Sequence, residues 1–188
     1  CCICYCISRK YSYLFLFIFI LEVILLSFEI MNVFSSLIQK QAVDEIVKCN
    51  DFTFRFGLTL SRQDAIELVE TRTVSLKSNG RIEFGGGVVE KIIKEFCDSP
   101  YISMHNYVET LHELIEIFYF YKNETLDLIS DDELIKFMKN SFDGKCQGSL
   151  ALLSGRELEK MARNVRYGYA PDYSEDNEYD EEDEDGEY

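Results

Sequence analysis

Three consecutive glycines, Gly85, Gly86 and Gly87, precede a predicted helix and are the first candidate for chemistry in this sequence. Main-chain amides at a helix start are unpaired and lie at the positive end of the helix dipole, so they bind phosphate or carboxylate. Arg81 and Lys91 would add positive charge. The spacing matches neither the P-loop nor the dinucleotide-binding fingerprint. The favoured interpretation is a tight structural corner where two backbones approach closely, with a weak anion site as the alternative.

A second candidate is a stripe of alternating histidines and glutamates at helical spacing, His105, Glu109, His112 and Glu116. On a helix these side chains fall within an arc of about 60°. Imidazole and carboxylate groups on one face could bind zinc or iron. A di-iron site needs a second Glu-x-x-His motif, and the sequence has only these two histidines. We therefore predict a solvated face without metal or cofactor, and keep the four residues as weak candidate ligands.

Four adjacent aromatic residues, Phe118 to Tyr121, surround more than one face of their predicted helix. They cannot all be buried on one side, so we predict that most belong to the core and that one or two form a partner-binding surface. Cys97 lies near the carboxyl end of a predicted helix, where the dipole disfavours a thiolate. It is predicted to be a core thiol rather than a nucleophile, and no catalytic residue is assigned.

These residues need helices to position them, and apolar periodicity predicts about six helices with short connections, an all-α fold. The predicted helices cover residues 32–49, 62–78, 88–97, 105–122, 131–143 and 156–166. Ser61, Ser130 and Ser154 each precede an acidic residue by three positions and predict capping boxes. Gly80 is predicted to take a left-handed conformation at a helix end.

The segment from Asn50 to Thr59 is less regular. Its alternating Phe52, Phe54 and Phe56 predict either a short strand or a packed, extended linker. Too few other strand signals follow for a sheet, so the segment is expected to be an exception within a helical domain.

The predicted domain covers residues 31–168 as one unit, flanked by two segments of different composition. Residues 171–188 carry eleven acids and no lysine or arginine, so 169–188 is predicted to be a disordered acidic tail. Residues 1–30 are predicted to lie upstream of a true start at Met31. The alternative is a membrane segment at 11–28, in which Glu22 would cost about 3 kcal/mol on insertion.

Charge and cysteine usage limit the possible partners and compartment. The net charge is −15, most of it in the tail, and no basic patch of the kind that binds nucleic acid is present. Cys49, Cys97 and Cys146 are odd in number and widely spaced. This pattern is typical of reduced thiols in the cytoplasm rather than of a disulfide framework.

The body of the chain resembles a known family. The motifs FGLTL, GRIEFGGG, EFCDSPY, YVETLHELIEIFYFYKNET, SDDELIKFM and FDGKCQGS occur in this order between about Met31 and Tyr167. Together they resemble a family of bacterial proteins known only as a domain of unknown function. The resemblance implies a small cytoplasmic bacterial protein, and it implies no activity, cofactor or site residue.

From these features we predict a non-catalytic protein-binding or adaptor module, with another protein as its partner and with no nucleic acid. We expect the protein not to contact a membrane if Met31 is the start. The first alternative is a ligand sensor or an enzyme that uses the Gly-rich helix start to bind an anion. The second alternative is a membrane-anchored protein.

Overall fold

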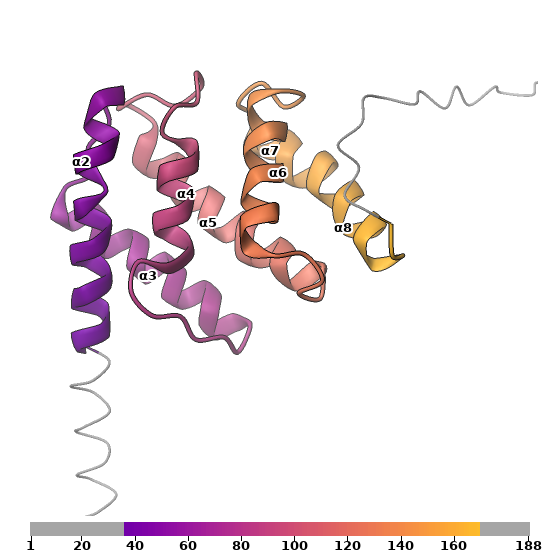
Figure 1. The fold of residues 1–188 in the computed structure, drawn as a ribbon, viewed down its shortest axis with the longest axis horizontal. Coiled ribbons are helices and arrows are strands. Elements are labelled where there is room, and N and C mark those ends of the chain that lie inside the picture. Colours follow the sequence, from indigo (N-terminus) through magenta and orange to yellow (C-terminus); the bar gives the residue numbers. More distant parts are fainter. Residues whose placement is uncertain (1–35, 170–188) are drawn as a thin grey trace, which may run out of the picture. The chain divides into compact units, whose positions relative to one another are not determined.

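The computed structural model describes residues 36–169, and every regular element in that range is a helix (Figure 1). The prediction of an all-α fold with about six helices is therefore confirmed for this part of the chain. No described helix is both long enough and apolar enough to span a membrane. The predictions made for residues 1–30 and for the acidic tail beyond Tyr169 lie outside the described residues.

The chain divides at Lys94, inside helix α4 (Gly87–Phe96), into two compact units. The prediction of one domain over 31–168 stays a prediction.

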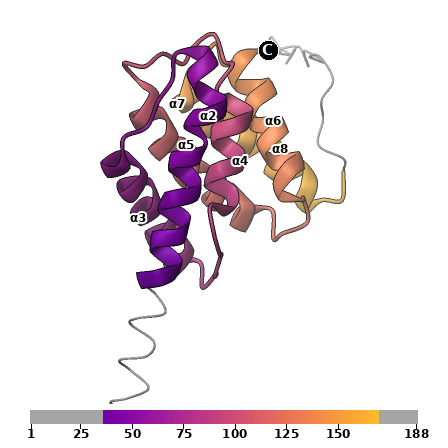
Figure 2. The same ribbon diagram turned by 60° about the vertical axis from the view of Figure 1, so that its left-hand side comes forward.

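The first unit contains a helical segment at 36–48, the short helices α2 (Asn50–Thr53) and η1 (Phe54–Phe56), helix α3 (Arg62–Ser78) and most of α4. Both α3 and α4 lie beside the 36–48 segment (Figure 2). Arg62 at the start of α3 pairs with Asp44 at 2.8 Å. Apolar side chains from all three helices are buried, including Ala42, Ile46, Leu68, Val69, Val89, Ile92 and Ile93.

Local signals correctly predicted the ends of α3. The Ser61 side chain accepts from the Asp64 amide, and the Asp64 carboxylate accepts from the Ser61 amide, which completes the capping box. After the helix, Gly80 has a φ of 63°. This left-handed conformation favours glycine because a Cβ would be strained there.

The prediction of a strand or an extended linker at Phe52, Phe54 and Phe56 is wrong, because these residues lie in α2 and η1. The Asn50 side chain explains the difference. Its amide group donates to the Leu60 carbonyl and accepts from the Leu60 amide, both at 2.8 Å. We call these two hydrogen bonds the Asn50 clasp. They hold two residues ten positions apart in contact, which is impossible if the chain between them is extended. Phe52 and Phe56 then meet one helical turn apart, with ring centroids separated by 6.0 Å.

The second unit contains α5 (Tyr107–Glu124), α6 (Asp131–Asp143), α7 (Leu150–Leu152), the π-helix η2 (Leu153–Leu158) and α8 (Glu159–Arg166). Helices α6, α7 and α8 all contact α5. The predicted capping box at Ser130 and Glu133 begins α6 and is confirmed. Buried side chains of this unit include Leu111, Leu114, Ile115, Phe118, Leu134, Met138, Phe142, Leu158 and Met161.

The predicted capping box at Ser154 is wrong, because the helix has already begun before that residue. Ser149 is the N-cap of α7, and its hydroxyl accepts from the Leu152 amide. Ser154 lies one turn inside the helix, where its hydroxyl donates to the Leu150 carbonyl at 3.0 Å. The chain passes from α7 through the π-helical turn of η2 into α8, and π turns often mark functional sites.

Candidate functional site

The four adjacent aromatic residues of α5 differ in burial, because they surround more than one face of the helix. Phe118, Tyr119 and Tyr121 are buried, whereas 56% of the Phe120 side chain is exposed. Three of the rings belong to the core of the second unit. Phe120 is therefore the aromatic residue of this run that a partner can reach.

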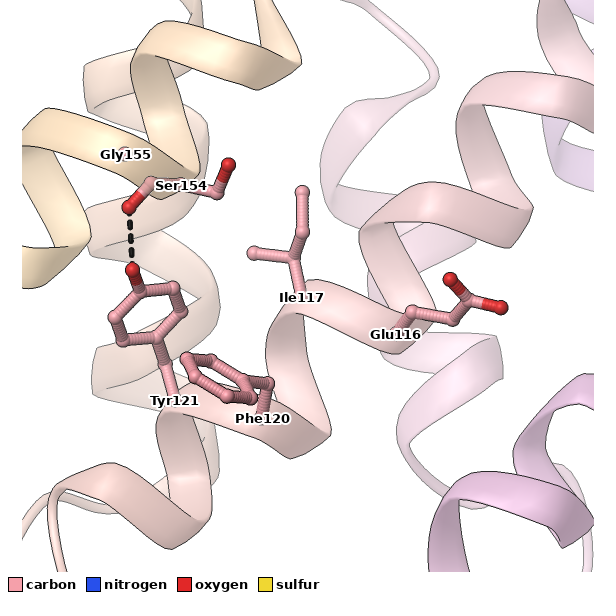
Figure 3. A pocket seen from close by; sticks show the side chains of 6 residues that line it. All are labelled: Glu116, Ile117, Phe120, Tyr121, Ser154 and Gly155. Atoms are coloured by element: carbon pink, nitrogen blue, oxygen red, sulfur yellow. Dashed lines mark hydrogen bonds between the residues drawn. The ribbon is translucent and has the colours of Figure 1, made fainter.

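Phe120 lines a hollow that we call the Phe120 groove (Figure 3). Its volume is about 350 Å³, near the lower end of the range for ligand pockets in proteins. The lining comes from α5 and η2 and consists of Glu116, Ile117, Phe120, Tyr121, Ser154 and Gly155. Figure 3 shows Ile117 pointing from α5 toward the side of η2, while the carboxylate of Glu116 points away from Ser154.

The wall of the Phe120 groove is held by a hydrogen bond between its two elements. The Tyr121 hydroxyl donates to the main-chain carbonyl of Ser154 (Figure 3). Burial raises the pKa of Tyr121, and the nearby carboxylates of Glu159 and Glu124 raise it further. The tyrosine therefore stays a neutral donor at physiological pH. Both carboxylates are themselves paired, Glu159 with Arg163 at 3.3 Å and Glu124 with Arg166 at 3.0 Å.

Gly155 leaves part of this groove open. A Cβ placed on Gly155 would meet no atom within 4 Å, and its φ lies outside the left-handed region. A larger side chain at this position would therefore extend into free space without straining the backbone. Sequence patterns did not indicate that Ile117, Ser154 and Gly155 line a common groove, because their proximity depends on how α5 packs against η2.

The triple-glycine corner of the first unit is a separate candidate. Gly85 and Gly87 have φ angles of 64° and 52°, whereas Gly86 is not in the left-handed region. The Gly86 amide donates to the Glu45 carboxylate, and the Val88 amide donates to the Glu83 carboxylate at 3.4 Å. The chain's own carboxylates therefore occupy the positions predicted for an external anion.

Arg72, which was not among the predicted residues, places its guanidinium at this corner. Its Nη1 atom donates to the Gly85 carbonyl at 2.5 Å, and only 2% of the residue is exposed. Arg81 is half-buried, and Lys91 is exposed. A sequence signal for Arg72 existed, since it occupies an apolar position of α3 between Leu68 and Leu76.

The predicted histidine and glutamate stripe is only partly helical. His105 is exposed and precedes α5, so it does not continue the helical spacing. Glu109 and Glu116 are exposed on α5, and His112 is half-buried. Within residues 36–169 no three histidine, cysteine or acidic side chains are grouped so as to hold a metal ion.

The cysteines of the described range are core residues. Cys49, Cys97 and Cys146 are all buried. Burial raises the pKa of Cys146, and the Glu157 carboxylate adds to this shift. A raised pKa keeps Cys146 in the unreactive thiol form.

Comparison with known proteins identifies a family for this chain. The sequence model of a family of unknown function (DUF6323) matches residues 45–171. Searches of curated proteins and of solved structures give no match.

Proposed function

We propose that this chain, which belongs to the family of unknown function DUF6323, is a non-catalytic protein-binding module that engages its partner at the Phe120 groove. One observation carries the proposal: a large aromatic side chain, 56% exposed, lies beside a hollow of about 350 Å³ with Ile117 on its wall. Exposed aromatic residues beside pockets are typical of the anchor positions of protein interfaces.

The chemistry of the groove defines the partner segment. Ile117 and Phe120 favour one large apolar side chain, because filling the hollow removes their surface from water. Glu116 lines the groove as an exposed carboxylate, whereas Glu124 and Glu159 near Tyr121 pair with Arg166 and Arg163 of the chain. We therefore expect the partner to carry an apolar anchor residue with lysine or arginine beside it, since opposite charges improve specificity and association rate.

We also place the protein in the cytoplasm of a bacterium, in agreement with the buried thiols of Cys49, Cys97 and Cys146. The sensor or enzyme alternative depends on the triple-glycine corner. There, two amides bind carboxylates of the chain, so an external anion would first have to displace one of them, and the adaptor proposal has the stronger support.

The test is a selection of random displayed peptides against the full chain, followed by measurement of their affinity. We expect the selected peptides to share a large apolar residue flanked by lysine or arginine. Gly155→Leu should abolish binding by filling the groove, and Phe120→Ser should weaken it at least tenfold. Leu128→Ser is the matched control, because Leu128 is an exposed apolar residue of the same unit that does not line the groove. Peptides that bind all variants equally, or no enriched motif, would overturn the proposal.

A further inference from the structure

The amino end of α4 already has the features of a carboxylate site, with a carboxylate of the chain bound in it. The Glu45 side chain reaches the Gly86 amide from the 36–48 segment, 41 residues earlier in sequence. The amide and the helix dipole both favour a negative charge at this position.

A second, independent observation at the same corner is the buried guanidinium of Arg72. Its Nη1 atom bonds the Gly85 carbonyl and lies 3.5 Å from the position of a Cβ on Gly87. Its Nε atom is buried and has no hydrogen-bond partner among the described residues. An unsatisfied buried donor on a cation is costly, so a ligand that supplied an oxygen to Nε, which Glu45 does not, would bind more favourably at this corner.

Glu45 is the movable part of this arrangement. It is half-buried, and its carboxylate also accepts from Gln41 at 2.9 Å, one turn back on the same segment. The Gln41 and Gly86 hydrogen bonds lower the pKa of Glu45, so it stays ionised at neutral pH. A side-chain rotation could move the carboxylate into solvent while the main-chain amide of Gly86 stays in place.

A hollow beside Glu45 offers space for the rest of a ligand. Its volume is about 390 Å³, and all of its lining belongs to the first unit: Glu45, Lys48, Cys49, Asp51, Phe52, Glu90 and Lys94. Phe52 supplies an apolar surface, and Arg55 stacks over its ring at 3.7 Å. A small molecule whose carboxylate replaced that of Glu45 would therefore have room beside the corner.

We propose that this corner is a binding site for a small carboxylate ligand, and that Glu45 is an internal competitor that occupies the site when no ligand is bound. The ligand carboxylate accepts from the Gly86 amide, Arg72 balances its charge, and the remainder lies in the hollow beside Phe52. The site is in the first unit and is independent of the Phe120 groove in the second.

The experiment titrates sodium acetate into the full chain at constant ionic strength and follows the backbone amide resonance of Gly86. In Glu45→Ala the competitor is absent, so we expect a saturable shift with an affinity at least tenfold higher than in wild type. The melting temperature of Glu45→Ala should rise with acetate in the same concentration range, because binding to the folded state stabilises it.

Asp44→Ala is the matched control, since it removes one carboxylate from the adjacent position of the same segment. It should behave like wild type. Arg72→Gln in the Glu45→Ala background should abolish the saturable shift; if it does not fold, Glu45→Gln, which keeps a neutral competitor, should bind acetate with intermediate affinity. An equal response in Asp44→Ala, no saturation in Glu45→Ala, or saturation with phosphate but not with acetate would overturn the proposal.

Discussion

The hydroxyl of Tyr121 donates a hydrogen bond to the main-chain carbonyl of Ser154, which joins α5 to the π-helical turn η2 across 33 positions of sequence. The bond closes one wall of the Phe120 groove, so it connects the packing of the second unit with the site proposed for partner binding.

Tyr121→Phe should lower the free energy of unfolding by about 1 kcal/mol, because it removes one intramolecular hydrogen bond and leaves the Ser154 carbonyl without that donor. Urea denaturation provides the measurement. Tyr167→Phe serves as the control, since Tyr167 is exposed near the end of α8. Equal midpoints for the two variants would show that the bond contributes nothing to stability.

Gly85→Ala should destabilise the first unit more than Gly80→Ala does. The two glycines have nearly the same φ, 64° and 63°, so each alanine incurs a similar backbone cost of about 1 kcal/mol. Only at Gly85 would the new Cβ lie 2.5 Å from a carboxylate oxygen of Glu45, which must move and lose its bond to Gly86.

Thermal or urea unfolding of both glycine variants measures this difference, and the Glu45→Ala background tests its cause. Without the Glu45 carboxylate, Gly85→Ala and Gly80→Ala should become equally destabilising. A difference that persists in that background would mean that another contact restricts Gly85.

Glu133→Gln should reduce the loss of stability at acid pH. Hydrogen bonds from the Ser130 hydroxyl and amide lower the pKa of Glu133 below 4.5 in the folded chain. A lowered folded pKa means that the ionised carboxylate stabilises the fold above about pH 4.5, and that this contribution disappears as pH falls through the folded pKa.

Unfolding free energies measured from about pH 6 to about pH 3 test this linkage. Glutamine can still accept the bond from the Ser130 amide but does not titrate, so its curve should be flatter than that of wild type below about pH 4.5. Glu113→Gln, at an exposed position of α5, should keep the wild-type slope. Parallel curves for wild type and Glu133→Gln would contradict the expectation.

Lys122→Met should destabilise the second unit by about 2–3 kcal/mol, because it removes a buried charged donor and leaves the buried carbonyl of Ile129 without that partner. Only 9% of the Lys122 side chain is exposed, and its ammonium binds the Ile129 carbonyl and the Asp131 carboxylate. These contacts stabilise the connection between α5 and α6, in which Leu126 and Asp127 both have positive φ.

Amide hydrogen exchange across the connection between α5 and α6 gives a local readout for this variant. The amides of 126–129 should exchange faster in Lys122→Met than in wild type, beyond the change in global stability. Lys136→Met is the control, because Lys136 is an exposed lysine of α6. Equal effects of the two substitutions would argue against a specific role for Lys122.

The sequence by itself determined the features that depend on neighbouring residues. The caps at Ser61 and Ser130 were predictable because donor and acceptor are three residues apart, and Gly80 because a left-handed helix end favours glycine. The surplus of aromatics in α5 indicated that one must be exposed, although it did not indicate which one.

Tertiary structure decided the features in which local signals compete or distant residues meet. Ser149 and Ser154 both precede helix-forming residues, and in the folded chain Ser149 is the cap. The Asn50 clasp on Leu60 makes the phenylalanine segment helical although its alternation favours a strand. Glu45, Arg72 and Gly86 meet from three separate segments, because a helix start and a buried cation attract a carboxylate wherever the chain brings one into reach.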